Sequence, residues 1–168
     1  MTQPIPTRAQ VVQALRFSGL EFLETLRKLP PEHFEKGCYE GGWNGRQVLA
    51  HVAAIEWTYP RLLEIPNQAP APAAGRDLPT RTAEGGIDAY NARQVEKRAG
   101  ATVAELLAEF EKNRAVTIAA VEGADEALLA TPIRSAGGAT GPVASVYQAV
   151  AVGHVLGHLR DIVGRDEG

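Results

Sequence analysis

The chain has 168 residues, of which 45% are hydrophobic and 22% charged, and its formal net charge at pH 7 is −3. These values are typical of a single soluble domain spanning residues 1–168. They argue against nucleic acid, whose binding proteins usually carry a basic patch. The longest apolar stretch is too short and too polar to span a membrane. A single cysteine and an N-terminus without a signal-peptide pattern predict a cytoplasmic protein.

Helical periodicity dominates the sequence from its first residues. Apolar side chains recur at spacings of three and four over residues 7–28, which predicts a first helix that a proline pair ends. A second helix is expected to begin after Asn44, an N-cap residue that can form a capping box with Gln47. Its apolar stripe fades by Ile65.

The second half of the chain predicts two further helical regions. Prolines and glycines over residues 66–86 indicate a long connection, which is unusual in a compact domain unless it crosses over or covers a site. Helical periodicity then resumes near residue 87 and continues to Val121, broken at Gly100 into one kinked helix or two consecutive helices. Glycines between 137 and 141 predict a flexible joint, and the last helix is expected over residues 142–163.

Three histidines lie on the apolar faces of these helices, which is uncommon unless something binds their nitrogens. His154 and His158 are one turn apart, so both imidazoles lie on one face of the last helix. His51 lies roughly 10 Å along the second helix, which matches the depth of the pair if the two helices are antiparallel. Together with the long connection, this predicts an all-α, up-down-down-up four-helix bundle.

Three neutral imidazoles favour zinc, nickel, iron or copper over magnesium or calcium, which prefer oxygen ligands. We expect His51, His154 and His158 to bind one such ion, with zinc or nickel favoured and iron as an alternative. Three protein ligands leave a coordination position open for water or substrate, which is the catalytic pattern. Position 155 is Val, so the H-E-x-x-H arrangement of metallopeptidases is absent.

Two segments resemble the DinB/YfiT-like superfamily: residues 42–51 (GWNGRQVLAH) and residues 153–162 (GHVLGHLRDI). Asn91-Ala92-Arg93 is similar to the same superfamily and to its branch of mycothiol-dependent maleylpyruvate isomerases. In that branch the last helix carries a pattern that resembles Glu-x₃-His, whereas position 154 of this chain is His. The resemblance implies an up-down-down-up bundle, a divalent metal on the three histidines, and a homodimer. It also implies a transferase or isomerase activity that uses a low-molecular-weight thiol.

The expected function is therefore metal-dependent thiol chemistry on a small electrophile. Tyr90, Asn91 and Arg93 follow the long connection and are candidates to bind the substrate or cofactor, with Arg93 suited to an anion. They are equally compatible with a solvated start of a helix. A metal-dependent hydrolase and a stress-related protein that binds metal or a small molecule without turnover remain alternatives.

Other polar and aromatic residues have plainer interpretations. Glu56 is expected at the surface. The alternative is that it acts as a base or as a partner that supports a metal ligand. His33 is expected to be solvated, and Cys38 has no evident base beside it that would activate a thiol. Trp43 is expected to pack at the end of the bundle, or else to form a pocket wall.

Overall fold

The computed structural model describes residues 4–37, 42–67, 87–135 and 138–164. In chain order the elements are α1 (Arg8–Arg27), η1 (Pro31–Glu35), α2 (Gly45–Glu56), η2 (Tyr59–Leu63), η3 (Ile65–Asn67), α3 (Ile87–Lys97), α4 (Val103–Glu122), α5 (Glu126–Leu129), β1 (Pro132–Arg134), β2 (Thr140–Pro142), α6 (Val143–Tyr147), η4 (Gln148–Gly153) and α7 (His154–Val163). The elements η1, η2 and η3 are short 3₁₀ helices, and η4 is a π-helical segment. The predicted predominance of helix is confirmed.

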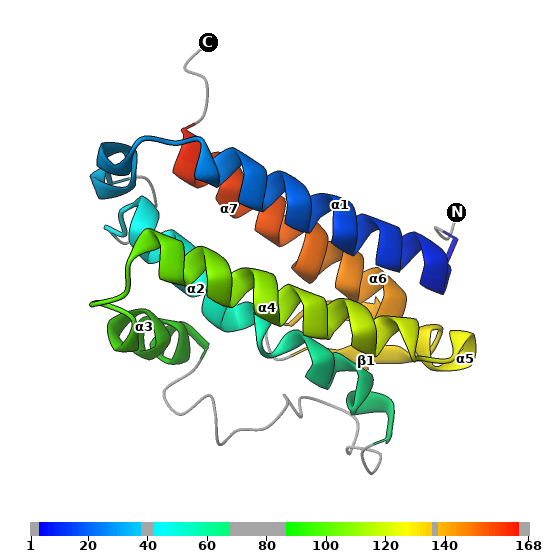
Figure 1. The fold of residues 1–168 in the computed structure, drawn as a ribbon. Helices are drawn as coiled ribbons and strands as arrows, with labels where there is room; N and C mark the ends of the chain where they lie inside the picture. Colours follow the sequence, from blue (N-terminus) through cyan, green and yellow to red (C-terminus); the bar gives the residue numbers. More distant parts are fainter. Residues whose placement is uncertain (1–3, 38–41, 68–86, 136–137, 165–168) are drawn as a thin grey trace.

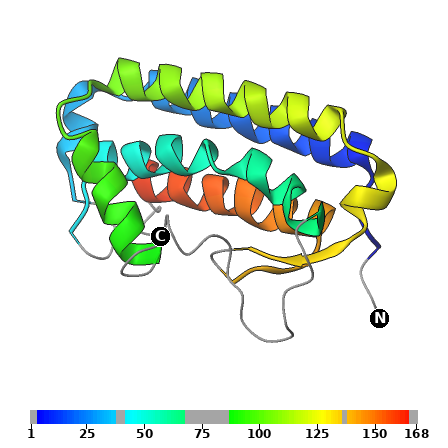
Figure 2. The ribbon, with the colours of Figure 1, turned by 90° about the horizontal axis from the view of Figure 1, so that it is seen from below.

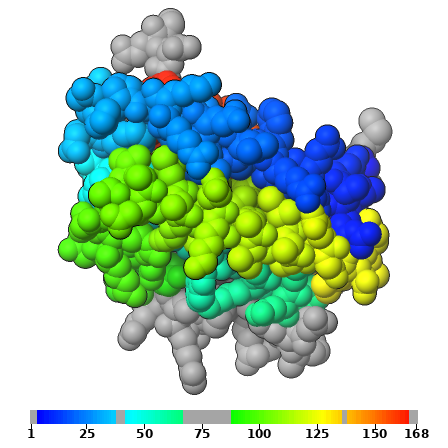
Figure 3. Space-filling model, viewed as in Figure 1, coloured from blue at the N-terminus to red at the C-terminus, as the bar shows by residue number. Residues whose placement is uncertain are grey.

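Four long helical segments make up the bundle, and in the fourth α6, η4 and α7 continue as one rod (Figure 1). α1 and α4 form one layer, which covers the face seen in Figure 3. α2 and the rod form the second layer, and α3 packs beside α2 on its outer side (Figure 2). α2 and α4 run in one direction, whereas α1 and the rod run in the other (Figure 1).

Contacts at both ends of α2 fix its orientation against the rod. At the start of α2, a Cβ on Gly45 would lie 3.4 Å from the side chain of Ile162, near the end of α7. Just beyond α2, the Tyr59 hydroxyl donates a hydrogen bond to the carbonyl of Val150 in η4. The start of one segment therefore lies beside the end of the other, and the two are antiparallel as the depths of the histidines predicted.

Local capping explains where the first two helices begin. The Thr7 side chain accepts a hydrogen bond from the Gln10 backbone, and the Gln10 side chain accepts one from Thr7. Asn44 and Gln47 make the same reciprocal pair at the start of α2, as the sequence predicted. Each capping box satisfies backbone N–H groups that have no partner within the helix, so the start of α2, and with it the position of His51, is set by the sequence close by.

The chain between α4 and the rod differs from the predicted glycine joint. In the part of it that the structure describes, β1 and β2 form an antiparallel hairpin in which Ile133 pairs with Gly141. Gly138 and Gly141 have φ angles of 89° and 131°, in the region that favours glycine over other residues. Strands of three residues that contain prolines carry too few alternating apolar positions to be recognised as strands.

The two remaining predictions about connections have different outcomes. The helical region after residue 87 is two separate helices, α3 and α4, with Thr102 as the N-cap of the second. The predicted connection over residues 66–86 lies almost entirely outside the described residues, which stop at Asn67 and resume at Ile87.

Two apolar clusters fill the bundle, one packed around Phe22 and Phe110 and the other around Leu15 and Tyr147. Between the two lies a buried polar layer to which three of the four long segments contribute. It consists of Ser18, Glu56, Arg114 and Thr117. Among the described residues, no helix combines the length and the apolar character needed to cross a membrane.

Candidate metal centre

His51, His154 and His158 come together in the second layer of the bundle. Each offers one ring nitrogen, and these three atoms all lie within 4.8 Å of one another. The ring centroid of His51 is 5.0 Å from that of His158 and 6.1 Å from that of His154. The predicted cluster is therefore formed by α2 and α7, the two antiparallel elements.

The spacing of the nitrogens fits a metal ion. Two nitrogens bound tetrahedrally at about 2.0–2.1 Å from an ion lie roughly 3.3 Å apart. The Nε2 atoms of His154 and His158 are 2.8 Å apart, so small side-chain rotations would bring the set to ligand geometry. His51 and His158 are buried, whereas His154 is exposed. An ion held there would be shielded by the bundle on one side and reachable from solvent on the other.

Two neighbouring side chains support the histidines. The Nδ1 atom of His158 lies 3.3 Å from the Asp161 carboxylate, one helical turn further along α7. A carboxylate in this position favours the proton on Nδ1, which directs the lone pair of Nε2 toward the other histidines. The ring of Trp43 lies 5.5 Å from that of His51 and packs against the core. Trp43 is thus both core packing and a wall beside the site.

The environment keeps these imidazoles neutral, which is the form that binds metal. Burial, and then the neighbouring histidines, lower the pKa of His51 to about 3. Burial and His154 lower the pKa of His158 to about 4, and the Asp161 carboxylate opposes that shift. Burial also lowers the pKa of His154. Neutral, closely spaced nitrogens in a mostly buried site are a donor set suited to a transition metal.

These shifts predict that acid destabilises the metal-free protein. In the unfolded chain histidine titrates near pH 6.5, so below that pH the unfolded state takes up protons that the folded site rejects. The free energy of unfolding should fall as the pH drops from about 6.5 toward 4, by up to about 1.4 kcal/mol per pH unit for each of His51 and His158. Urea unfolding of the wild type and of His51→Gln at several pH values measures the effect. Parallel pH profiles for the two proteins would contradict it.

The candidate substrate-binding residues lie on α3. Tyr90 and Asn91 are half-buried there, and Arg93 is exposed. α3 packs against α2, the helix that carries His51. The contacts of the described residues do not join these three side chains to the histidines, so their role stays a prediction.

The structure corrects the interpretations of Glu56 and His33, and it does not describe Cys38. Glu56, expected at the surface, is fully buried and its carboxylate lies 3.0 Å from the guanidinium of Arg114. His33, expected to be solvated, is half-buried and donates from Nε2 to the carbonyl of Ile162, 2.7 Å away, at the end of α7. Cys38 lies outside the described residues.

The sequence analysis missed two residues that hold other polar side chains: Asp161 beside His158, and Arg114 beside Glu56. Asp161 carried a usable signal, since a carboxylate three residues after a histidine lies beside it on a helix. Arg114 carried none, because its buried position depends on partners from three other segments.

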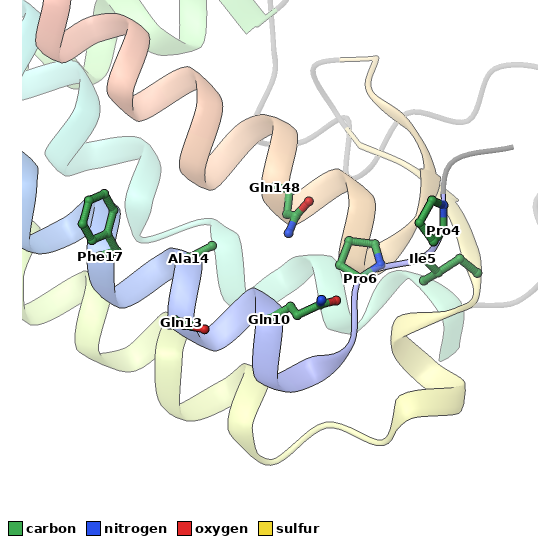
Figure 4. Close-up of a pocket in the computed structure, with 8 residues that line it drawn as sticks. All are labelled: Pro4, Ile5, Pro6, Gln10, Gln13, Ala14, Phe17 and Gln148. Atoms are coloured by element: carbon green, nitrogen blue, oxygen red, sulfur yellow. The ribbon is translucent and has the colours of Figure 1, made fainter. Parts of the chain in front are cut away.

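A second concave feature lies elsewhere on the molecule. A groove of about 640 Å³ runs between the chain before α1, the first turns of α1 and the rod (Figure 4). Gln148 lines it from the rod, the exposed Phe17 from α1, and the exposed Ile5 from the chain before α1. None of the three histidines lines this groove, so it is separate from the candidate metal centre.

The fold is similar to the crystal structure of a mycothiol-dependent maleylpyruvate isomerase, with a TM-score of 0.69 and 18% identity. That match covers 96% of this chain and 63% of the isomerase, so this chain spans less than two thirds of it. A Streptococcus pneumoniae structural-genomics protein matches with a TM-score of 0.71 and 13% identity, over 97% of this chain and 92% of its own.

No curated protein matches the sequence. The DinB superfamily, in contrast, matches over residues 14–162, which include all of the three-histidine cluster and most of the bundle. The resemblance seen in the motifs around His51 and His158 therefore extends over nearly the whole chain. The protein belongs to the DinB superfamily.

Proposed function

We propose that the protein binds one divalent transition metal ion through His51, His154 and His158 and catalyses thiol-dependent transfer or isomerisation of a small electrophile. The observation that carries the proposal is the convergence of three neutral imidazoles in a site that is buried at two ligands and open at the third. The imidazole donors favour zinc or nickel, with iron as an alternative.

The chemistry follows from the open side of the site. A divalent ion held by three histidines would keep a bound thiol in its thiolate form at neutral pH. The exposed position of His154 supports approach of the thiol and the electrophile from its side. His51 and His158 lie too deep to meet bulk water, and the Trp43 ring beside His51 supplies an apolar surface against which a thiol chain can pack.

We assign substrate binding to Tyr90, Asn91 and Arg93 on α3. Arg93 is exposed, and a guanidinium pairs bidentately with a carboxylate, so a small anionic electrophile is the substrate class that fits it. The half-buried Tyr90 and Asn91 offer a hydroxyl and an amide that can orient the rest of the molecule. The name of the isomerase with the similar fold gives maleylpyruvate and mycothiol as the first pair to assay.

The test is turnover by metal-loaded protein purified without an affinity tag. Zinc- and nickel-loaded protein is mixed with mycothiol, bacillithiol or glutathione and with maleylpyruvate or another small anionic electrophile. We expect turnover with at least one thiol, its loss in His158→Ala with the helical content retained, and a raised KM in Arg93→Ala at unchanged metal content. Stoichiometric metal without turnover under any of these conditions would instead identify a binding protein.

A further inference from the structure

The rod that carries His154 and His158 is not a regular α-helix. Its buried side chains at Val143, Tyr147, Ala151, Val155 and Leu159 are spaced by four residues throughout. A straight α-helix has 3.6 residues per turn, so over these sixteen residues it would rotate this face away by about 160°. The π-helical segment η4, directly before His154, has wider turns and keeps the face toward the bundle.

In the π segment the Val150 carbonyl loses the amide donor that it would have in an α-helix. In an α-helix the His154 amide would donate to the carbonyl of Val150, four residues earlier. Here it donates to Ala149, five residues earlier. The Tyr59 hydroxyl replaces that amide as the donor to the Val150 carbonyl, at 2.8 Å. A carbonyl left unpaired at this depth is unfavourable, so the hydroxyl stabilises the π form over the α form of the rod.

The same tyrosine is held from the other side. The Tyr147 hydroxyl, at the end of α6, donates to the Tyr59 carbonyl at 2.7 Å. Both tyrosines are buried, and Tyr59 lies three residues beyond Glu56, the last residue of α2. We call these two hydrogen bonds the tyrosine clasp. The clasp ties the end of α2 to the rod at the level of η4.

A second bridge reaches the same turn from α2. The Arg114 guanidinium donates to the Ala151 carbonyl in η4 at 2.6 Å and pairs with the Glu56 carboxylate at 3.0 Å. Two independent connections therefore run from the end of the helix that carries His51 to the turn that precedes His154. Neither involves a histidine, so neither is part of the ligand set.

We propose that Tyr59 is a positioning residue for the metal centre: by pairing the Val150 carbonyl it holds η4 in the π form, and this form sets the rotation that brings His154 and His158 to His51. The inference rests on the metal site proposed above. If the π turn tightened to an α turn without moving the residues before it, the helix beyond would rotate by about 100° and shift by about 1.5 Å. A rotation of that size would separate the two α7 imidazoles from His51.

The test compares Tyr59→Phe with a matched control. Tyr59→Phe keeps the ring and removes only the hydroxyl, whereas Ile133→Val removes one methylene from the same apolar cluster without touching the clasp. We expect the Co²⁺ dissociation constant of Tyr59→Phe to rise about ten- to hundredfold, as for other groups that orient ligands. Its Co²⁺ absorption bands should also change. Ile133→Val should keep the wild-type constant and spectrum, because a role in stability alone alters neither.

Two further measurements close the test. Tyr147→Phe removes the other half of the clasp and should weaken Co²⁺ binding in the same direction, which covers the case in which Tyr59→Phe does not fold. In metal-free Tyr59→Phe, amide hydrogen exchange should quicken over residues 148–158 and stay unchanged in the middle of α4. Wild-type Co²⁺ affinity and spectrum in a folded Tyr59→Phe would overturn the clasp but leave the metal site standing. Failure of the wild type to bind Co²⁺ would overturn both.

Discussion

Alanine in place of His51, His154 or His158 is expected to abolish stoichiometric metal binding, from about one ion per chain to a trace. Each histidine supplies one of three nitrogens that lie within 4.8 Å of one another, and two remaining imidazoles hold an ion far more weakly. The loss of metal affinity should exceed the roughly 10- to 100-fold loss that follows removal of a residue that hydrogen-bonds to a ligand. Elemental analysis of untagged protein and titration with Zn²⁺ measure it.

The fourth histidine of the chain provides the control. His33 contacts the end of α7 through the Ile162 carbonyl and has no part in the cluster, so His33→Gln should retain the metal. Metal at about 100 times its dissociation constant should also stabilise the wild type and His33→Gln by about 2.7 kcal/mol. It should not stabilise the alanine variants of the cluster. A full complement of metal in His154→Ala would refute the site.

The candidate site could be predicted from the sequence because the features that determine it are local. His154 and His158 are four residues apart on a helix, and that spacing alone places both on one face. The depth of His51 follows from the Asn44 cap, which the sequence identifies and the structure contains. Counting residues from helix ends was therefore enough to predict that the three imidazoles meet.

Features that depend on distant partners could not be predicted in this way. Glu56 lies four residues after Val52, on a buried face of α2, and the cation that compensates its buried carboxylate is Arg114, far along the chain. His33 was misjudged for the same reason, since its acceptors are carbonyls at the far end of the chain. The π segment left a trace in the four-residue spacing of the rod. A pattern of that kind does not reveal which group pairs the displaced carbonyl.

Arg114→Met is expected to destabilise the folded protein by about 3–5 kcal/mol, because it leaves the Glu56 carboxylate buried without its cation. Glu56 is fully buried, and the partner that remains to it among the described residues is the Thr117 hydroxyl, 2.8 Å away. The double variant Glu56→Gln/Arg114→Met should recover a large part of that loss, since it removes the unpaired charge. Urea unfolding of the two single variants and the double variant gives the coupling directly.

The control and the pH dependence separate charge burial from lost packing. Arg98→Met breaks a partly exposed ion pair with Glu109 and should cost at most about 1 kcal/mol.

Burial raises the pKa of Glu56, and the Arg114 charge opposes that shift, so without Arg114 the carboxyl holds its proton to higher pH. A folded-state pKa above the unfolded value means that stability is lost as the pH rises. The cost of Arg114→Met should therefore be larger at pH 8 than at pH 5. An equal cost at both values would mean that lost packing and hydrogen bonds, rather than the buried carboxylate, account for it.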